Sequence, residues 1–326
     1  MKKILGLGNA LIDLIFKIEN DEWLTRFGLP KGSMTLVDEE KARIILNLTQ
    51  KLDKEIAAGG SASNTINGLA RLGVKCGYIG KIGKDEYGEH FSREMSSNHI
   101  EPNLLFGESQ TGTAIALLSP DAERTFATYL GAAIELNADD LTDELFKGYN
   151  YFHIEGYLVQ NHELIQKAVQ LAKKNGLIVS IDMASFNVVE ANIDFLTDII
   201  ENYIDIVFAN EEEAKAFTGK NPKEALNIIA TKCEIAVVKI GKDGSLIKRG
   251  NEIIHVEGIK AIPRDTTGAG DLYASGFLYG LTKGYDLELS GKIGSLLGGK
   301  VIEVYGARLS EEKWMDIMES IKELTS

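Results

Sequence analysis

Two aspartates flank a glycine-rich turn in DTTGAGDLYASGFLYGL, which occupies residues 265–281. Gly268, Ala269 and Gly270 carry no bulky side chain, so a ligand can approach their backbone amides closely. The apolar residues that follow recur at helical spacing and predict a helix that begins near residue 269. Unpaired N–H groups and the dipole at the start of such a helix form a binding site for an anion.

Asp271 is expected in the first turn of this helix, beside the anion site. A carboxylate in that place costs electrostatic free energy, so it needs a purpose. Removing the proton from a hydroxyl group that attacks a phosphate is such a purpose. A helix start with acidic capping residues is the alternative for Asp271 alone, but the whole string D-T-T-G-A-G-D favours phosphate chemistry.

A second glycine motif, AAGGSASNTINGLARLG at residues 57–73, places a double glycine before a predicted helix that carries Asn64. Together the two motifs resemble the N-terminal and C-terminal signatures of the ribokinase-like (PfkB) carbohydrate and nucleoside kinase family. The resemblance extends over essentially the whole chain. It implies that the protein uses ATP and Mg²⁺ to phosphorylate a primary hydroxymethyl group of a nucleoside or sugar. It also implies that Asp271 is the general base and that the amides of residues 268–270 form the anion hole.

The resemblance places the phosphoryl acceptor near the end of the first expected strand, residues 3–8, where open α/β sheets bind ligands. In the family, the aspartate that matches Asp13 binds two sugar hydroxyls, and a carboxylate is suited to accept both hydrogen bonds. Arg124, within ERTFATY, matches a lid arginine that can neutralise phosphate charge, and a surface ion pair is the alternative. The implied acceptor-binding residues are Asn9, Asp13, Gly60, Asn64 and Arg124.

The resemblance assigns further loops to the nucleotide and its metal ion. NEEE at residues 210–213 resembles the family's N-x-x-E, through which Asn210 and Glu213 would organise Mg²⁺ and phosphates by way of water. Taken alone, this string is an ordinary acidic helix start. KIGKDG at residues 239–244 resembles a turn beside the nucleotide. The implied nucleotide-binding residues are Asn210, Glu213, Lys239, Gly241, Gly244, Thr266, Gly268 and Gly270.

Some family members also bind a monovalent cation such as K⁺, through carbonyl groups near the anion loop. The positions that match this site by resemblance are Asp265, Thr267, Gly306 and Ser310. Bracing of the loop is the other role open to Asp265.

Several loop residues favour a nucleoside over a sugar as the acceptor. Ribokinases typically carry a lysine after the double glycine, where this chain has Ser61. The spacing N-x-x-x-D in GNALID, the stretch ERTFATYLGAA and the expected strand YFHIEGY at residues 151–157 look more like the adenosine-kinase branch. Bacterial relatives of this appearance also include kinases of other nucleosides and simple sugars. Ribose, fructose and 2-keto-3-deoxygluconate therefore remain alternative acceptors.

Buried-strand runs alternate with amphipathic helices along the chain, a rhythm typical of βαβ units. This rhythm predicts an α/β fold of three layers, α/β/α, with a mainly parallel central sheet in a single domain over residues 1–326. Two segments, approximately 11–38 and 104–131, break the rhythm with short extended pieces and are expected to form a small β-sheet lid. The expected helices span residues 39–50, 61–73, 86–98, 161–175, 189–202, 268–283 and 286–304.

The acidic composition narrows the choice of partners. With 35 Lys and Arg against 48 Asp and Glu, the net charge of −13 argues against binding to nucleic acid or to an anionic membrane. No apolar run reaches the roughly 20 residues of a membrane-spanning helix. Cys76 and Cys233 have no metal-binding spacing, so a reduced, cytoplasmic protein is expected. Edge strands of the lid could pair with those of a second copy in a homodimer.

Three rival interpretations are weaker. GLGNAL at residues 6–11 follows a strand, but Leu11 stands where a dinucleotide-binding fingerprint needs a third glycine. A ligand-sensing protein that keeps the fold without catalysis would be expected to lose its base, and Asp271 is present. A P-loop kinase would need the motif GxxxxGK[ST], which the sequence lacks.

Overall fold

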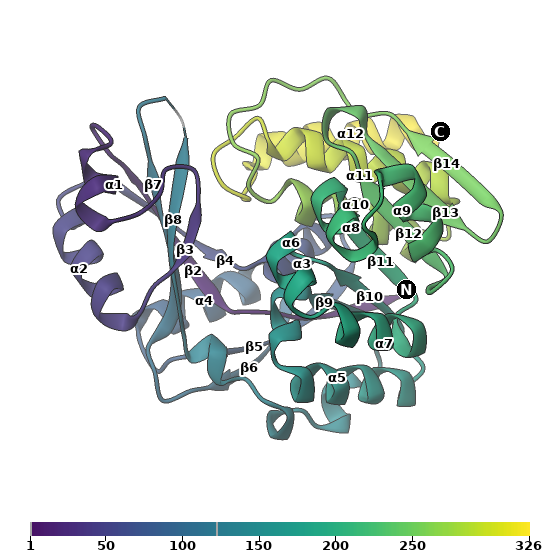
Figure 1. Cartoon of the computed structure of the whole chain (residues 1–326), viewed down its shortest axis with the longest axis horizontal. Coiled ribbons are helices and arrows are strands. Elements are labelled where there is room, and N and C mark those ends of the chain that lie inside the picture. The colour runs from purple at the N-terminus through teal and green to yellow at the C-terminus, as the bar shows by residue number, and fades with distance from the viewer. Residues whose placement is uncertain (1, 122) are drawn as a thin grey trace.

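The computed structural model describes residues 2–121 and 123–326 (Figure 1). A nine-stranded sheet lies at its centre. Its strand order is β14 (Glu252–Val256), β13 (Ser245–Arg249), β12 (Ile235–Lys239), β11 (Ile206–Asn210), β10 (Ile178–Asp182), β9 (Tyr151–Glu155), β1 (Lys3–Leu7), β5 (Lys75–Ile82), β6 (Ile100–Phe106). Neighbouring strands from β12 to β6 pair in parallel, and β13 and β14 add an antiparallel hairpin at one edge.

Helices cover both faces of this sheet, which is why its central strands are apolar on both sides (Figure 1). On one face lie α3 (Ser61–Arg71), α4 (Glu86–Ser97), α10 (Ala269–Lys283), α11 (Leu287–Val301) and α12 (Glu311–Thr325). On the other lie α5 (His162–Lys174), α6 (Phe186–Ala191), α7 (Ile193–Tyr203), α8 (Glu211–Thr218) and α9 (Pro222–Ile229). The predicted three-layer α/β/α fold with a mainly parallel sheet is confirmed.

Short 3₁₀ helices complete the connections. They are η1 (Ala132–Glu135), η2 (Ala138–Asp140), η3 (Asp143–Phe146), η4 (Gly156–Gln160) and η5 (Gly241–Asp243). In the described part of the chain, no helix combines the length and the apolar character needed to cross a membrane.

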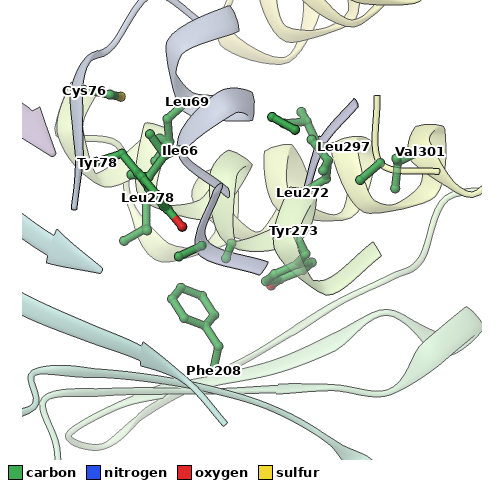
Figure 2. Packing of buried hydrophobic residues seen from close by; sticks show 14 of the residues in the cluster. Ile66, Leu69, Cys76, Tyr78, Phe208, Leu272, Tyr273, Leu278, Leu297 and Val301 are labelled. Carbon is green, nitrogen blue, oxygen red and sulfur yellow. The ribbon is translucent and has the colours of Figure 1, made fainter. Parts of the chain in front are cut away.

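The apolar core beneath α3 and α10 fixes the two helices that start at the glycine motifs. Figure 2 shows Ile66 and Leu69 of α3 close to Tyr78 of β5 and Leu278 of α10, while Phe208 of β11 points up from the sheet. All five side chains are buried in one cluster. Burial of side chains of this size stabilises the fold by about 1.5–3 kcal/mol each.

Helices α3 and α10 approach each other closely at Gly68. A Cβ atom on Gly68 would overlap the side chain of Ser275 in α10. The Ser275 hydroxyl donates a hydrogen bond to the carbonyl oxygen of Thr65, 2.8 Å away. This tight packing places the first turns of α3 and α10 side by side.

A second, five-stranded sheet stands beside the main one, and we call it the lid (Figure 1). Its order is β3 (Met34–Leu36), β8 (Arg124–Gly131), β7 (Thr111–Leu118), β2 (Leu11–Lys17), β4 (Lys54–Gly59). Helices α1 (Glu22–Phe27) and α2 (Glu39–Thr49) lie on its side away from the main sheet. Relative to the segments expected for the lid, the sheet also includes β4, whereas residues 104–106 belong to β6 of the main sheet.

One predicted helix is divided in the structure, and three helices were not predicted, namely α1, α9 and α12. The helix predicted over residues 189–202 is divided into α6 and α7 at Asn192, whose backbone angles (φ −129°, ψ 25°) are not helical. The Asn192 side chain donates a hydrogen bond to the carbonyl oxygen of Val188, 2.9 Å away, and so closes α6. Helix α12 was not predicted, although Ser310 caps it by accepting a hydrogen bond from the amide of Lys313 at 3.3 Å.

Candidate active site

A cleft of about 1580 Å³ lies between the lid and the main sheet. It gathers most of the residues singled out from the sequence, although these come from motifs far apart in the chain. The predicted residues that line it are Asn9, Asp13, Gly60, Asn64, Asn210, Glu213, Lys239, Gly241, Gly244, Thr266, Thr267, Gly268, Ala269, Gly270 and Asp271. Among the described residues, Arg124, Asp265, Gly306 and Ser310 were also predicted but lie outside this lining.

The floor of the cleft is formed by the carboxyl ends of neighbouring parallel strands. Glu155 ends β9, Asp182 ends β10, Asn210 ends β11 and Lys239 ends β12, while Asn9 follows β1. Because parallel strands all end at the same edge of a sheet, these five polar side chains meet there. This is the usual place for a ligand in an open α/β sheet.

Asp271 lies in the first turn of α10 and is held by two residues of α3. The Ser61 hydroxyl donates to its Oδ1 at 2.7 Å, and Asn64 Nδ2 donates to its Oδ2 at 2.9 Å. Burial raises the pKa of Asp271 to about 6, and the two hydrogen bonds oppose that rise. The carboxylate is thus ionised at neutral pH and yet is a stronger base than an aspartate in water.

The glycine turn before α10 exposes backbone amides to the cleft. Gly268 has a left-handed backbone (φ 76°), and its carbonyl oxygen accepts the Leu272 N–H at 2.8 Å. Within the described residues, the amides of Gly268 and Gly270 have no hydrogen-bond acceptor, whereas the Ala269 amide donates to the Thr266 carbonyl oxygen at 3.2 Å. Two of the three amides predicted for the anion hole are therefore free to bind an anion.

Lys239 adds a positive charge beside this turn. Its Nζ lies 2.6 Å from Oδ2 of Asp182, and a Cβ atom on Gly270 would lie only 2.9 Å from the same nitrogen. Burial lowers the pKa of Lys239, but the carboxylates of Asp182 and Glu213 outweigh burial and raise it above its usual range. The ammonium group thus stays charged next to the free amides.

Asn210 and Glu213 form the capping box at the start of α8. Asn210 Nδ2 donates to Oε1 of Glu213 at 2.7 Å, and the Glu213 amide donates to Oδ1 of Asn210 at 2.9 Å. Burial, reinforced by Asp182, raises the pKa of Glu213 to about 7. The two residues thus cap a helix, as an acidic helix start would, and also line the cleft.

Across residues 2–121 and 123–326, no three His, Cys, Asp or Glu side chains form a group that could hold a metal ion. A divalent ion at this site would therefore take most of its ligands from phosphate oxygens and water. Mg²⁺ is commonly bound in this way.

The opposite end of the cleft carries Asp13, Asn9 and Glu155. Burial raises the pKa of Asp13 to about 6, and the positive charges of Arg308 and Arg124 oppose that rise. Asn9 Nδ2 donates to Oε1 of Glu155 at 2.6 Å, and burial raises the pKa of Glu155 to about 7. Acceptors of this kind suit a ligand that has several hydroxyl groups.

A broad apolar wall lines the cleft beside Asp13, which belongs to the same lid sheet. Met34, Leu36 and Ile134 are large side chains that are 48%, 56% and 68% exposed. Exposed apolar groups that gather in one cleft usually mark a binding surface. Further apolar residues of the same wall are Leu11, Phe126 and Leu130.

Arg124 joins the lid to the glycine turn. Its Nη2 lies 2.9 Å from Oδ2 of Asp265, and both side chains are only 6% exposed. Asp265 also accepts hydrogen bonds from the Thr267 hydroxyl at 2.7 Å and the Gly306 amide at 2.6 Å. Asp265 therefore braces the turn, and backbone carbonyl groups would have to bind any monovalent cation there.

Five residues in or beside the site were not assigned from the sequence. Glu155 and Asp182 each end an apolar strand with one acidic residue, in FHIE and IVSID, and this signal could have pointed to them. Glu94 and Arg308 lie behind Asn64, and their motifs carry no comparable signal. Ser61 was noted only as a departure from the ribokinase pattern.

Comparison with known proteins shows the family of the chain. Residues 38–314 match the model of the pfkB family carbohydrate kinases. The chain belongs to this family. It is 30% identical to an adenosine kinase of Saccharomyces cerevisiae, over 95% of this chain and 97% of that protein.

Two further relatives of this PfkB kinase cover nearly its whole length. It is 30% identical to a 5-dehydro-2-deoxygluconokinase of Clostridium perfringens, over 94% of both chains. Its fold matches the crystal structure of an adenosine kinase from Sinorhizobium meliloti with a TM-score of 0.88 and 32% identity, over 98% of this chain and 99% of that chain. The resemblance to ribokinase-like kinases is confirmed.

Proposed function

We propose that this PfkB kinase transfers the γ-phosphoryl group of ATP to a primary hydroxyl group of a nucleoside. The position of Asp271 carries the proposal, because it directly follows the free amide of Gly270 and its carboxylate binds Ser61 and Asn64, which line the same cleft. A base with a pKa of about 6 can accept a proton from a hydroxyl group at neutral pH.

The residues around Asp271 have separate roles in the phosphoryl transfer. The amides of Gly268 and Gly270 stabilise the negative charge of the phosphoryl group in the transition state, together with the ammonium group of Lys239. Asp13 accepts hydrogen bonds from a pair of hydroxyl groups and so holds the acceptor beside Asp271. Closure of the lid excludes water, which limits hydrolysis of ATP.

The acidic residues at the ends of β10 and α8 suit a metal ion that the nucleotide brings with it. Asp182 and Glu213 line the cleft next to Lys239, and we assign them to Mg²⁺ through its water ligands. When bound, Mg²⁺ would neutralise negative charge on the phosphate groups of ATP. Ile259, Pro263 and Ile302 line the cleft near the glycine turn and provide an apolar place for the adenine of ATP.

The apolar wall of the lid supports a nucleoside as the acceptor. A nucleoside has hydroxyl groups at one end and a flat, largely apolar base at the other, and the cleft likewise offers Asp13 and Asn9 for hydroxyl groups and Met34, Leu36 and Phe126 for an apolar group. A free sugar has hydroxyl groups on every side, and those that lie against the apolar wall would have no hydrogen-bond partner there. Relatives named as adenosine kinases agree with this choice.

A sugar or sugar acid is the second candidate acceptor. The relative from Clostridium perfringens is named a 5-dehydro-2-deoxygluconokinase and is as similar in sequence as the yeast adenosine kinase. The same base and anion hole would serve a sugar, and only the use of the apolar wall would differ.

ATP consumption by the purified protein with Mg²⁺ and K⁺ tests both acceptors. The panel holds adenosine, inosine, guanosine, cytidine, ribose, fructose and 2-keto-3-deoxygluconate. We expect adenosine or another nucleoside to give the highest kcat/KM. A preference for a free sugar would contradict the nucleoside assignment and leave the kinase assignment in place.

The Asp271→Asn variant tests the assignment of the base. It keeps the size of the side chain but cannot accept the proton, so we expect kcat to fall by at least about 10²-fold while ATP binding is kept. Equal losses of ATP affinity and turnover would contradict the role of Asp271 as the base.

A further inference from the structure

Arg308 lies in the segment between α11 and α12 and makes contacts in three directions. Its Nη1 donates to Oδ1 of Asn64 at 2.9 Å, and its Nε donates to Oε1 of Glu94 at 2.9 Å. Its Nη2 donates to the carbonyl oxygen of Ala58 in β4. One guanidinium group thus connects α3, α4 and the strand of the lid that leads into the double glycine.

The contact with Asn64 decides which way the amide of Asn64 points. Arginine has only donors, so the Asn64 oxygen must face Arg308. An ionised carboxylate has only acceptors, so the Asn64 nitrogen must face Asp271. The observed hydrogen bonds satisfy both requirements at 2.9 Å each. If Arg308 were removed, the amide could rotate and turn its oxygen toward Oδ2 of Asp271, where two acceptors repel each other.

We infer that Arg308 is a positioning residue for phosphoryl transfer, which holds the Asn64 amide and, through it, the carboxylate of Asp271. The inference rests on the proposed function, because it assumes that Asp271 is the base. Among the residues that the structure describes, Arg308 does not line the cleft. Its effect on Asp271 is therefore indirect, through Asn64, whereas its charge acts on the acceptor-binding Asp13 by lowering the pKa of that carboxyl.

Glu94 extends the same arrangement to the lid. Its Oε2 accepts the Ala58 N–H at 2.7 Å while Arg308 donates to the Ala58 carbonyl oxygen, so the pair holds both sides of one residue of β4. Next to Ala58, Ala57 pairs with Asp13 in the lid sheet. The pair of Arg308 and Glu94 therefore supports both the base, Asp271, and the acceptor-binding residue, Asp13. The planar guanidinium group of an arginine donates in several fixed directions at once, which the ammonium group of a lysine cannot do.

A double-mutant cycle tests whether Arg308 acts through Asn64. Arg308→Met is made in the wild-type chain and in the Asn64→Ala chain, and kcat and KM for ATP are measured with adenosine, or with the best acceptor of the panel above. In the wild-type chain we expect kcat to fall by about tenfold or more, with KM for ATP within about twofold. In the Asn64→Ala chain we expect Arg308→Met to lower kcat by less than about twofold, because the amide it orients is gone.

Two further variants separate positioning from general support. Arg308→Lys keeps the charge but loses the fork, so we expect it to recover only part of kcat. Glu94→Gln leaves Arg308 in place but removes the negative charge that holds its guanidinium group. It should lower kcat in the wild-type chain more than in the Asn64→Ala chain. It also gives the same test if Arg308→Met fails to fold.

Arg71→Met is the matched control. Arg71 also pairs with a glutamate, Glu311, and its guanidinium lies over Trp314, but it has no contact with Asn64 or Asp271. Its removal should leave kcat unchanged. An equal fall in kcat for Arg308→Met in both chains would overturn the inference. Turnover that persists in Asp271→Asn would contradict the role of Asp271 as the base. No ATP consumption with any acceptor of the panel would overturn the proposed function itself, so the failures are distinguishable.

Discussion

The hydroxyl group of Ser61 donates a 2.7 Å hydrogen bond to Oδ1 of Asp271. Ser61 is the first residue of α3, and Asp271 lies in the first turn of α10, so the bond joins the two glycine motifs directly. A serine supports the carboxylate without adding a charge. A lysine at this position would lower the pKa of Asp271 further and weaken it as a base.

Removal of this hydroxyl should shift the pH dependence of the reaction. The Ser61 hydrogen bond lowers the pKa of Asp271, so Ser61→Ala should raise it above about 6. Because the base must be ionised, the acidic limb of the kcat profile should move to higher pH, and the loss in kcat should be larger at pH 6 than at pH 8. Ser320→Ala, which removes an exposed hydroxyl of α12, is the control. An acidic limb that does not move would contradict the role of Ser61.

The acceptor should depend on Asp13 more than ATP does. Asp13→Asn keeps the shape of the side chain but replaces an acceptor oxygen by a donor, so one hydroxyl of the acceptor loses its partner. Hydrogen bonds to a charged group contribute about 1.5–3 kcal/mol, which predicts a rise in acceptor KM of roughly tenfold or more. Steady-state kinetics with each substrate varied in turn would measure this. A normal acceptor KM, or an equal rise in KM for ATP, would place the acceptor elsewhere.

The sequence predicted the layers of the fold and most of the cleft because both depend on local patterns. Apolar runs such as residues 205–210 indicate buried strands, and the glycine motifs mark the starts of α3 and α10. The parallel arrangement then brings Asn210, Lys239 and Asp271 together at one edge of the sheet. Periodicity was sufficient for the layers of the fold, whereas Asn210 and Lys239 were predicted from the resemblance of their loops to the ribokinase-like family.

The sequence could not predict contacts that depend on distant segments. Arg308 reaches Ala58 and Asn64 only because the chain between α11 and α12 returns to the lid, and no local pattern reports that path. Strand β4 was missed because its lysine and glutamate are exposed and only its end is buried. The role of the Ser61 hydroxyl could not be predicted, because its partner Asp271 lies 210 residues away on α10.

The ion pair of Lys239 and Asp182 should be important for stability as well as for the site. The side chains are 13% and 8% exposed, and removal of one partner of a buried pair costs about 3–5 kcal/mol. We therefore expect Lys239→Met to lower the free energy of urea unfolding by a few kcal/mol. The double variant Asp182→Asn with Lys239→Met leaves no unpaired charge in the pair and should recover part of that loss but not the affinity for ATP. A double variant that is less stable than the single one would contradict this account.

Gly60 is the single residue between β4 and α3. Its backbone is left-handed (φ 94°), and a Cβ atom would overlap the carbonyl oxygen of Asn9. Gly60→Ala should therefore destabilise the fold in two ways, by about 1–3 kcal/mol of backbone strain and by displacement of Asn9 from Glu155.

Gly73→Ala separates these two effects. Gly73 also has a positive φ (81°), and no atom lies within 4 Å of the place where its Cβ would be. This control should show the strain alone, with a smaller loss of unfolding free energy and an unchanged acceptor KM. Gly60→Ala should show the larger loss and a raised acceptor KM, because Asn9 lines the acceptor end of the cleft. Equal losses of stability in the two variants, with acceptor KM unchanged in both, would mean that the approach of Gly60 to Asn9 has no part in shaping the site.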